Sequence, residues 1–302
     1  MFKWIIENKL AQGPIPSPSE LESLKKVFTT IIILTMPHEN PLGGKYIELI
    51  EGHGFKTIHI PTRESFPPQL FELMKTVLRI EEEINSEGKI LVSCKGGLGR
   101  SGTVTAAFLV YSGLEVYQAI KEVRRKIPGS LENKGQVSMV EAFSTLVKIT
   151  TASFLKNYSS LIGKIEDRVE IAHASKTVQF TLELLNNLTI KGINTREVVL
   201  GSLTHFHNQT YRRMIIEQLG LSIDQSLLEN PLVEFSHELD GLMDGRVVIT
   251  QYDSHPGLVE ITLLCDQDCG SIVEKAVSSR HLLVDLIEKE VRINWGYYLD
   301  YV

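Results

Sequence analysis

The first half of the chain alternates short apolar runs with stretches in which apolar residues keep helical spacing. Residues 70–84 carry such a helical face, with leucine, isoleucine, methionine and valine recurring three and four positions apart. The apolar runs are β-branched and bounded by polar, proline or glycine residues, which is typical of buried parallel strands. They cover residues 29–35, 55–60 and 89–94. The pattern predicts an α/β fold in which helices flank a mostly parallel sheet.

The second half follows a different pattern, so we predict a separate α+β domain there. The period is lost near residues 148–158, which places the domains at 1–150 and 155–302. Apolar positions at helical spacing are followed by two alternating strands and then by a helix and a last strand. The expected helices cover residues 158–188, 195–219, 226–243 and 270–289, and the expected strands are "RVVITQY", "LVEITLL" and "VRINW". We identify no known family in this half.

The charge balance argues against a dedicated nucleic-acid binder. The whole chain of 302 residues has a net charge of -6. The first 150 residues hold 18 basic and 16 acidic residues, whereas the remainder holds 13 basic and 21 acidic ones. Neither half has the basic surplus that nucleic-acid binding requires. The acidic second half could offer a surface to a protein partner or to another copy of the chain, although a solvated exterior explains the charge equally well.

The apolar runs are too short to cross a membrane, since a spanning helix needs about 18 such residues. The N-terminal "MFKWIIENKL" carries charges where a signal peptide has an apolar core. Three cysteines do not make a disulfide framework. We therefore expect a protein of the cytoplasm that has no membrane contact.

The stretch "KILVSCKGGLGRSGTVTAAFLV" joins the strand that ends at Cys94 to a helix through a glycine-rich loop. Its "GLGRSG" fits the spacing of a dinucleotide-binding turn, but that fold then requires a helix, a strand and an acidic residue. Here a buried helix over residues 103–112 is followed by a second helical face over residues 116–127. The order of elements therefore favours the other interpretation, a loop that binds and attacks phosphate.

Displacement at a phosphate monoester needs a formed nucleophile, donors around the non-bridging oxygens and a proton for the leaving group. Cys94 faces the N-terminus of the next helix, where the dipole and free N–H groups favour a thiolate and a bound anion. Arg100 can offer its planar fork to two phosphate oxygens, and Ser101 can donate a hydrogen bond to the sulfur. The glycines let successive N–H groups point inward as an anion nest. The expected phosphate-binding residues are Lys95, Gly96, Gly97, Leu98, Gly99 and Arg100.

The nine residues "CKGGLGRSG" resemble the signature loop of cysteine-based protein phosphatases, most closely the compact dual-specificity group that includes archaeal members. The similarity covers about residues 1–148. It implies a general acid in a loop of the form Pro-x-x-Asp-x-x-x-Pro, and "IPTRESFPP" places Glu64 where the family has aspartate. It also implies a glutamine that positions the hydrolytic water, here Gln136. A surface carboxylate is the alternative role for Glu64.

The chain departs from the family pattern directly before the nucleophile, where Ser93 replaces the usual histidine. The resemblance implies catalysis by Cys94, Arg100, Glu64, Ser101 and Gln136. It also implies that no metal or other cofactor takes part, and that a phosphorylated protein is the substrate.

The preferred function is a dual-specificity phosphatase acting on phosphotyrosine and on phosphoserine or phosphothreonine. One alternative is a phosphatase for phosphoinositides or other small phosphate esters, because Lys95 also occurs in relatives that act on such lipids. The other alternative is a module that binds phosphorylated partners without turnover, which the changes at Ser93 and Glu64 suggest.

The second half offers two weaker patterns. Cys265 and Cys269 in "CDQDC" could form a redox pair or join a metal site, but the spacing fits no common zinc motif, and two ordinary thiols are expected. His205 and His207 fall within a helical pattern, where residues two apart point to different faces. We therefore expect no metal site in the chain.

Overall fold

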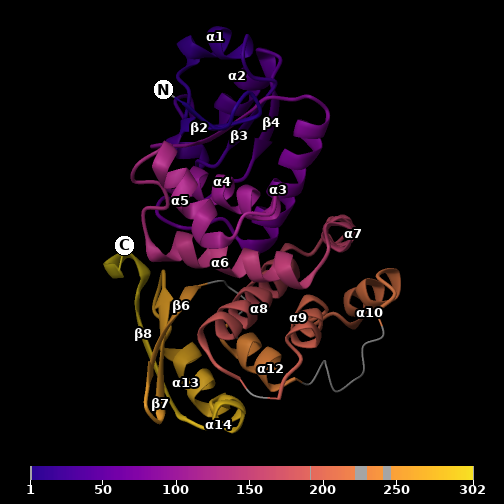
Figure 1. Cartoon of the computed structure of the whole chain (residues 1–302), viewed down its shortest axis with the longest axis vertical. Helices are drawn as coiled ribbons and strands as arrows, with labels where there is room; N and C mark the ends of the chain where they lie inside the picture. The colour runs from indigo at the N-terminus through magenta and orange to yellow at the C-terminus, as the bar shows by residue number, and fades with distance from the viewer. Residues whose placement is uncertain (1, 191, 222–229, 241–245, 302) are drawn as a thin grey trace. The chain divides into compact units, whose positions relative to one another are not determined.

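The computed structural model describes residues 2–190, 192–221, 230–240 and 246–301. These residues form two compact units, one of Met1–Pro68 with Glu72–Ser144 and the other of Gln69–Phe71 with Thr145–Val302 (Figure 1). Each unit has its own sheet. The proposed domain limits, 1–150 and 155–302, remain a prediction.

The first unit contains a five-stranded sheet in the order β1-β2-β5-β3-β4. β1 runs antiparallel to β2, and the other three strand pairs are parallel. This confirms the predicted mostly parallel sheet. The strands are β1 (Lys3–Ile6), β2 (Leu10–Pro14), β3 (Thr30–Ile33), β4 (Lys56–His59) and β5 (Ile90–Cys94).

Helices cover both faces of this sheet, with α1 and α2 on one side and α4 and α5 on the other (Figure 1). The helices are α1 (Leu21–Lys25), α2 (Tyr46–Gly52), α3 (Leu70–Asn85), α4 (Gly99–Tyr111), α5 (Val116–Lys126) and α6 (Lys134–Ile149), with short 3-10 helices at Pro18–Glu20, Pro37–Glu39 and Gly43–Lys45. All residues of the central strand β5 are buried, so both of its faces lie in the apolar core. Such burial explains why this strand reads as a continuous apolar run.

The second unit combines helices with a three-stranded sheet in the order β6-β7-β8. β6 and β7 are antiparallel, and β7 and β8 are parallel. The strands are β6 (Val247–His255), β7 (Leu258–Cys265) and β8 (Glu290–Tyr297). The helices are α7 (Ala152–Ile162), α8 (Arg168–Asn187), α9 (Thr195–Leu203), α10 (Gln209–Gln218), α12 (Pro231–Glu238), α13 (Gly270–Ser279) and α14 (His281–Ile287), followed by a 3-10 helix at Tyr298–Tyr301.

Three long helices predicted for the second half are each divided, and the one expected over residues 270–289 is divided into α13 and α14. In the other two, a polar side chain starts a new helix inside the apolar pattern. Asp167 accepts hydrogen bonds from the backbone of the first turn of α8, and Asn208 does the same for α10. His205 and His207 therefore lie in the turn between α9 and α10, so their predicted placement within a helix is wrong. The prediction for residues 226–243 lies partly outside the described residues.

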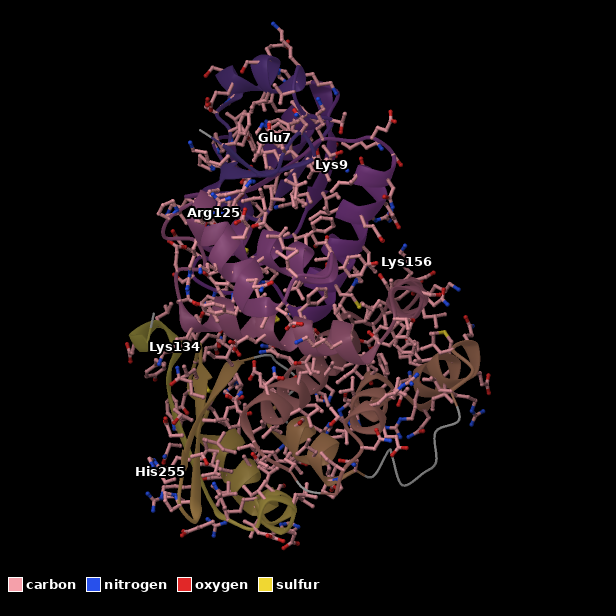
Figure 2. All side chains as sticks on the ribbon, in the orientation of Figure 1. Glu7, Lys9, Arg125, Lys134, Lys156 and His255 are labelled. Atoms are coloured by element: carbon pink, nitrogen blue, oxygen red, sulfur yellow. A yellow bond between two sulfur atoms is a disulfide. The ribbon has the colours of Figure 1, made fainter. Side chains whose placement is uncertain are left out.

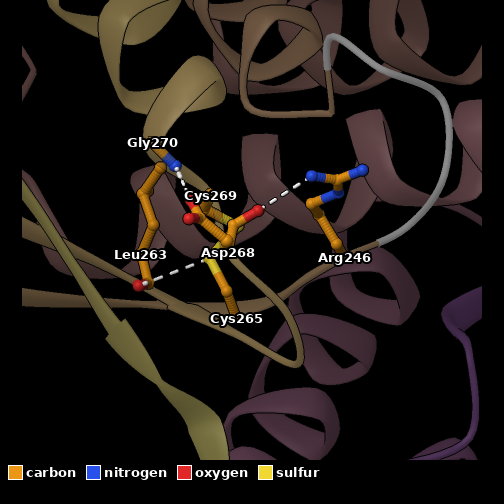
Figure 3. Close-up of a disulfide and its surroundings, with 6 residues drawn as sticks. All are labelled: Arg246, Leu263, Cys265, Asp268, Cys269 and Gly270. Atoms are coloured by element: carbon orange, nitrogen blue, oxygen red, sulfur yellow. Dashed lines mark hydrogen bonds between the residues drawn. A yellow bond between two sulfur atoms is a disulfide. The ribbon is translucent and has the colours of Figure 1, made fainter.

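The prediction of two ordinary thiols is also wrong, because Cys265 and Cys269 form a disulfide (Figure 3). The turn between β7 and α13 brings their Cα atoms to 6.4 Å, within the range that a disulfide spans. The backbone carbonyl of Asp268 in this turn accepts a hydrogen bond of 2.8 Å from Arg246. These two cysteines therefore do not support the argument for a reducing compartment.

Within the described ranges, every helix is too short or too polar to cross a bilayer.

Candidate active site

Cys94 is the last residue of β5, the central strand of the first sheet. Its side chain is buried, and its Sγ lies 3.3 Å from the hydroxyl of Ser101 in the first turn of α4. Parallel strands direct their carboxyl ends, and the loops that follow, to one edge of a sheet, where ligands commonly bind. The strand-loop-helix arrangement predicted around Cys94 is therefore present, with Ser101 at the sulfur.

One glycine of the loop, Gly97, is required by its backbone conformation and by neighbouring backbone atoms, and Gly99 packs closely against two side chains. Gly97 has a φ of +73°, and a Cβ on this residue would lie 2.3 Å from the carbonyl carbon of Gly13. A Cβ on Gly99 would lie 2.1 Å from a carboxylate oxygen of Glu132 and 2.5 Å from the Gln136 amide nitrogen. Gly96 is different, because a Cβ there would meet nothing within 4 Å. Gly97 and Gly99 thus let the loop pack against β2 and the start of α6.

Gln12 stabilises the glycine-rich loop through hydrogen bonds, a role that the sequence analysis did not predict. Its amide nitrogen donates to the carbonyl of Gly97 at 2.9 Å and to the Ser130 hydroxyl at 3.0 Å, and its oxygen accepts from Thr105 at 2.6 Å. All of these contacts are buried. A glutamine inside the apolar strand β2 was the available signal, because a buried amide must find partners.

Arg100 is held by Glu39, which sequence reasoning also missed. The Nη1 and Nη2 atoms of Arg100 donate to the two carboxylate oxygens of Glu39 at 2.7 and 2.9 Å, and Nη1 also donates to the carbonyl of Thr62 at 2.6 Å. The side chains of Arg100 and Glu39 are 3% and 6% exposed. One edge of the guanidinium is therefore occupied by protein, and among the described residues no hydrogen bond involves its Nε.

Burial disfavours the charged forms of Arg100 and Glu39, and the contact between the two side chains favours those forms. Although desolvation disfavours the guanidinium, the hydrogen bond to Glu39 and the charge of Cys94 raise the pKa of Arg100 above its ordinary value. Desolvation likewise acts against the Glu39 carboxylate, but hydrogen bonds from Arg100 and from the Met36 backbone hold the pKa of Glu39 below its usual value. The pair therefore stays ionised at neutral pH.

Glu64 lies in the loop between β4 and α3. It is beside the glycine-rich loop of residues 95–100, the predicted phosphate loop. Its carboxylate forms an ion pair of 2.8 Å with the Nζ of Lys95, and both side chains are more than half exposed. The hydrogen bond from Lys95 to Glu64 is the main reason why the pKa of Lys95 is raised. The structure thus brings Glu64 to the residue that follows Cys94.

Gln136 and Asn133 connect the Glu64 loop to the phosphate loop. Both side-chain amides donate to the carbonyl of Ser65, at 3.4 Å from Gln136 and 2.8 Å from Asn133. The Gln136 oxygen accepts from the backbone of Glu132 at 2.8 Å. Since Gln136 also packs against Gly99, it lies between the two loops that the sequence assigned to catalysis.

Ser93 stands behind the nucleophile with its hydroxyl buried, and no described residue offers that hydroxyl a hydrogen bond. We expect Ser93→Ala to leave the free energy of unfolding unchanged or to raise it by up to about 1 kcal/mol, because no hydrogen bond is lost. The matched control is Ser130→Ala, whose hydroxyl accepts from Gln12 and whose loss is expected to cost about 1 kcal/mol. Equal destabilisation by both changes in urea unfolding would contradict this account.

Comparisons with known proteins find relatives over the part of the chain that carries this loop. Residues 1–153 match the family model described as "PTP-SAK: Swiss Army Knife protein, DSP-PTPase phosphatase domain". The protein tyrosine phosphatase domain-containing protein 1 of Mus musculus is 25% identical over 260 residues, covering 74% of this chain and 34% of the relative. The phosphatidylglycerophosphate phosphatase PTPMT2 of Arabidopsis thaliana is 29% identical over 168 residues, covering 54% of this chain and 72% of the relative.

Among solved structures, the active form of the archaeal Tk-PTP is 33% identical. It matches 47% of this chain and 95% of its own, with a TM-score of 0.45. The chain spans about a third or less of the length of the first curated relatives that it matches.

Proposed function

Because this chain belongs to the Swiss Army Knife DSP-PTPase phosphatase family, we propose that its first unit hydrolyses phosphate monoesters of proteins through a phosphocysteine intermediate. Phosphotyrosine and phosphoserine or phosphothreonine are the proposed substrates. The observation that carries the proposal is the buried Cys94 at the carboxyl end of β5, with Ser101 at its sulfur and Arg100 fixed in the same loop.

In the first step, the Cys94 thiolate attacks phosphorus and the bond from phosphorus to the ester oxygen breaks. The backbone N–H groups of the loop and the Nε edge of Arg100 hold the non-bridging oxygens. Glu64 in its acid form gives its proton to the leaving oxygen. This assignment of edges follows from Glu39, which already occupies Nη1 and Nη2.

In the second step, water attacks the phosphocysteine and the bond between sulfur and phosphorus breaks. Glu64, now a carboxylate, takes a proton from the water, and the amide of Gln136 orients that water. The hydroxyl of Ser101, 3.3 Å from Sγ, donates to the sulfur as it leaves. Inorganic phosphate and the thiolate are the products, and this route needs no metal ion.

The test of the function is phosphate release from matched phosphotyrosine, phosphothreonine and phosphoinositide substrates in EDTA, with Cys94→Ser as the blank. Release from phosphopeptides that disappears in the variant supports the proposal. Binding of phosphopeptides without release by the unaltered protein would instead identify a non-catalytic reader.

A lipid phosphate is the second candidate substrate, because the relative PTPMT2 is named as a phosphatidylglycerophosphate phosphatase and Lys95 adds a cation beside the loop. A second basic residue at the position of Leu98 would favour a lipid phosphate, so the leucine there counts against this candidate. Faster turnover of phosphatidylglycerophosphate or phosphoinositide vesicles than of phosphopeptides would favour this candidate over the protein phosphatase.

The role of Glu64 can be tested by Glu64→Gln. We expect kcat for an alkyl phosphate such as phosphothreonine to fall about 100-fold, because the leaving oxygen loses its proton donor. A substrate with an acidic leaving group, such as p-nitrophenyl phosphate, should lose far less in the bond-breaking step. Glu51→Gln, on an exposed part of α2, is the control. An equally small loss for both substrates would make Glu64 a surface carboxylate.

A further inference from the structure

Four histidines that are far apart in the sequence meet in the second unit. His173 is fully buried on α8, and His237 is half-buried on α12. His205 and His207 come from the turn between α9 and α10, and His207 is exposed. The ring of His173 lies 4.7 Å from that of His207 and 4.8 Å from that of His237, between centroids.

The ring nitrogens converge on one another. Nε2 of His173 lies 3.0 Å from Nδ1 of His237, and Nε2 of His205 lies 2.9 Å from the same atom. One nitrogen each from His173, His207 and His237 can be chosen so that all lie within 4.8 Å of one another. Nitrogens that bind one tetrahedral zinc ion at its usual bond length are about 3.3 Å apart. Small side-chain rotations would therefore let these rings share an ion.

Two carboxylates position the histidine cluster through hydrogen bonds. Oδ2 of Asp240, itself buried, lies 2.9 Å from Nδ1 of His173. Such a contact places the ring proton on Nδ1 and turns the lone pair of Nε2 toward the other histidines, as carboxylates do behind metal-binding histidines. The Glu170 carboxylate accepts from the backbone N–H groups of His207 and Asn208 at 3.1 and 3.0 Å, which fixes the turn that carries His207.

Hydrogen bonds between neutral rings cannot satisfy these nitrogens. Because Asp240 takes the His173 proton at Nδ1, His237 Nδ1 must donate to the lone pair of His173. His205 Nε2 then faces an N–H as well, so it must be the acceptor and its own proton must be on Nδ1. Within the described part of the chain, however, that buried Nδ1 has no hydrogen-bond partner. A metal ion accepts lone pairs from several rings at one point, so the nitrogens of His173 and His205 no longer share the single N–H of His237.

We propose that His173, His207 and His237 bind a divalent transition metal ion, with zinc as the ion that best suits neutral imidazoles. Asp240 orients His173, and His205 is the candidate for a fourth ligand. Since His207 is exposed, the site opens to solvent and can exchange its ion. This proposal differs from the sequence-based expectation of no metal site, and it is independent of the phosphatase proposal.

The test uses the full chain without a polyhistidine tag, as the Cys94→Ser variant so that the free thiol cannot bind metal. After treatment with EDTA and removal of the chelator, Co²⁺ is titrated in while visible absorption is recorded, and Zn²⁺ is then used to displace it. We expect one equivalent to bind with the strong absorption of tetrahedral cobalt. Weak absorption of the octahedral type, or no saturable binding, would overturn the proposal.

Variants locate the ion. His207→Ala changes an exposed side chain and is expected to fold, yet to lose at least about 10-fold in Co²⁺ affinity, and Asp240→Asn should lose about 10- to 100-fold. His255→Ala is the control, because His255 is exposed at the end of β6 (Figure 2). If His207→Ala, shown to be folded by circular dichroism, binds Co²⁺ as tightly as the His255 control, the proposed site is wrong.

Discussion

Replacing Cys94 by serine is expected to lower phosphate release by about 10⁴-fold or more, while the protein keeps its fold and its ability to bind phosphate esters. The loss follows because a hydroxyl is far less ionised than a thiol and no other group in the loop can form the covalent intermediate. The change is nearly isosteric, and Arg100 and the loop amides that would bind the substrate remain in place.

The measurement is steady-state release of phosphate in EDTA, paired with isothermal titration of a phosphopeptide into the variant. Ser93→Ala is the matched control, because it alters the neighbouring residue and leaves the sulfur in place. A Cys94→Ser protein that retains more than about 1% of the activity would show that another group carries the reaction.

Much of the first unit could be predicted because its elements are local patterns. The run that ends at Cys94 is apolar on both faces, and the glycines and the arginine after it stand within nine residues. Chemistry confined to one loop is visible in the sequence, since spacing along the chain then fixes spacing in space. Glu64 and Gln136 required the family resemblance, because they reach the loop from elements 30 and 42 positions away.

The contacts that hold the loop could not be predicted in this way. Glu39 reaches Arg100 from 61 positions away, and Gln12 reaches Gly97 from 85 positions away. Neither residue belongs to a local pattern, and a carboxylate or an amide of this kind is most often found on the surface. Only the order of strands in the sheet, β2-β5-β3, makes them neighbours.

The second unit was harder to predict for a different reason. Its apolar period continues across Asp167 and Asn208, so the sequence predicts one helix at each place where the structure has two. The capping contacts of Asp167 and Asn208 separate them. Once the turn after α9 is placed, His205 and His207 are no longer bound to opposite faces of a helix. Helix caps therefore decide whether these histidines can meet His173 and His237.

The second large effect concerns Glu39, whose replacement by glutamine is expected to lower the free energy of unfolding by about 3–5 kcal/mol. Glutamine cannot balance the charge of Arg100, and an uncompensated buried charge is costly. We also expect kcat/KM to fall, because the guanidinium loses the contact that fixes its orientation. Urea unfolding and phosphate release measure the two effects on the same preparation.

Glu122→Gln is a matched control for this change. Glu122 accepts two hydrogen bonds of 2.8 Å from Arg125, through Nε and Nη2, so this pair is bidentate like Glu39 with Arg100. The Arg125 side chain, however, is 65% exposed, and Figure 2 places it at the surface of its unit. A surface pair of this kind contributes little to stability, because water screens both charges. Equal losses in the two variants would show that burial does not set the strength of the Glu39 contact.

The pH dependence of the Glu39 effect has a defined sign. Hydrogen bonds from Arg100 and the Met36 backbone keep the pKa of Glu39 in the folded protein below its usual 4.5. The contribution of the carboxylate is therefore fully present above that value and is lost as the pH falls through the lower, folded pKa. Unfolding free energies of the wild type and of Glu39→Gln should differ most at neutral pH and converge as the solution is acidified through the folded pKa of Glu39, which lies below 4.5. A difference that grows on acidification would mean that Arg100 does not hold Glu39 in its ionised form.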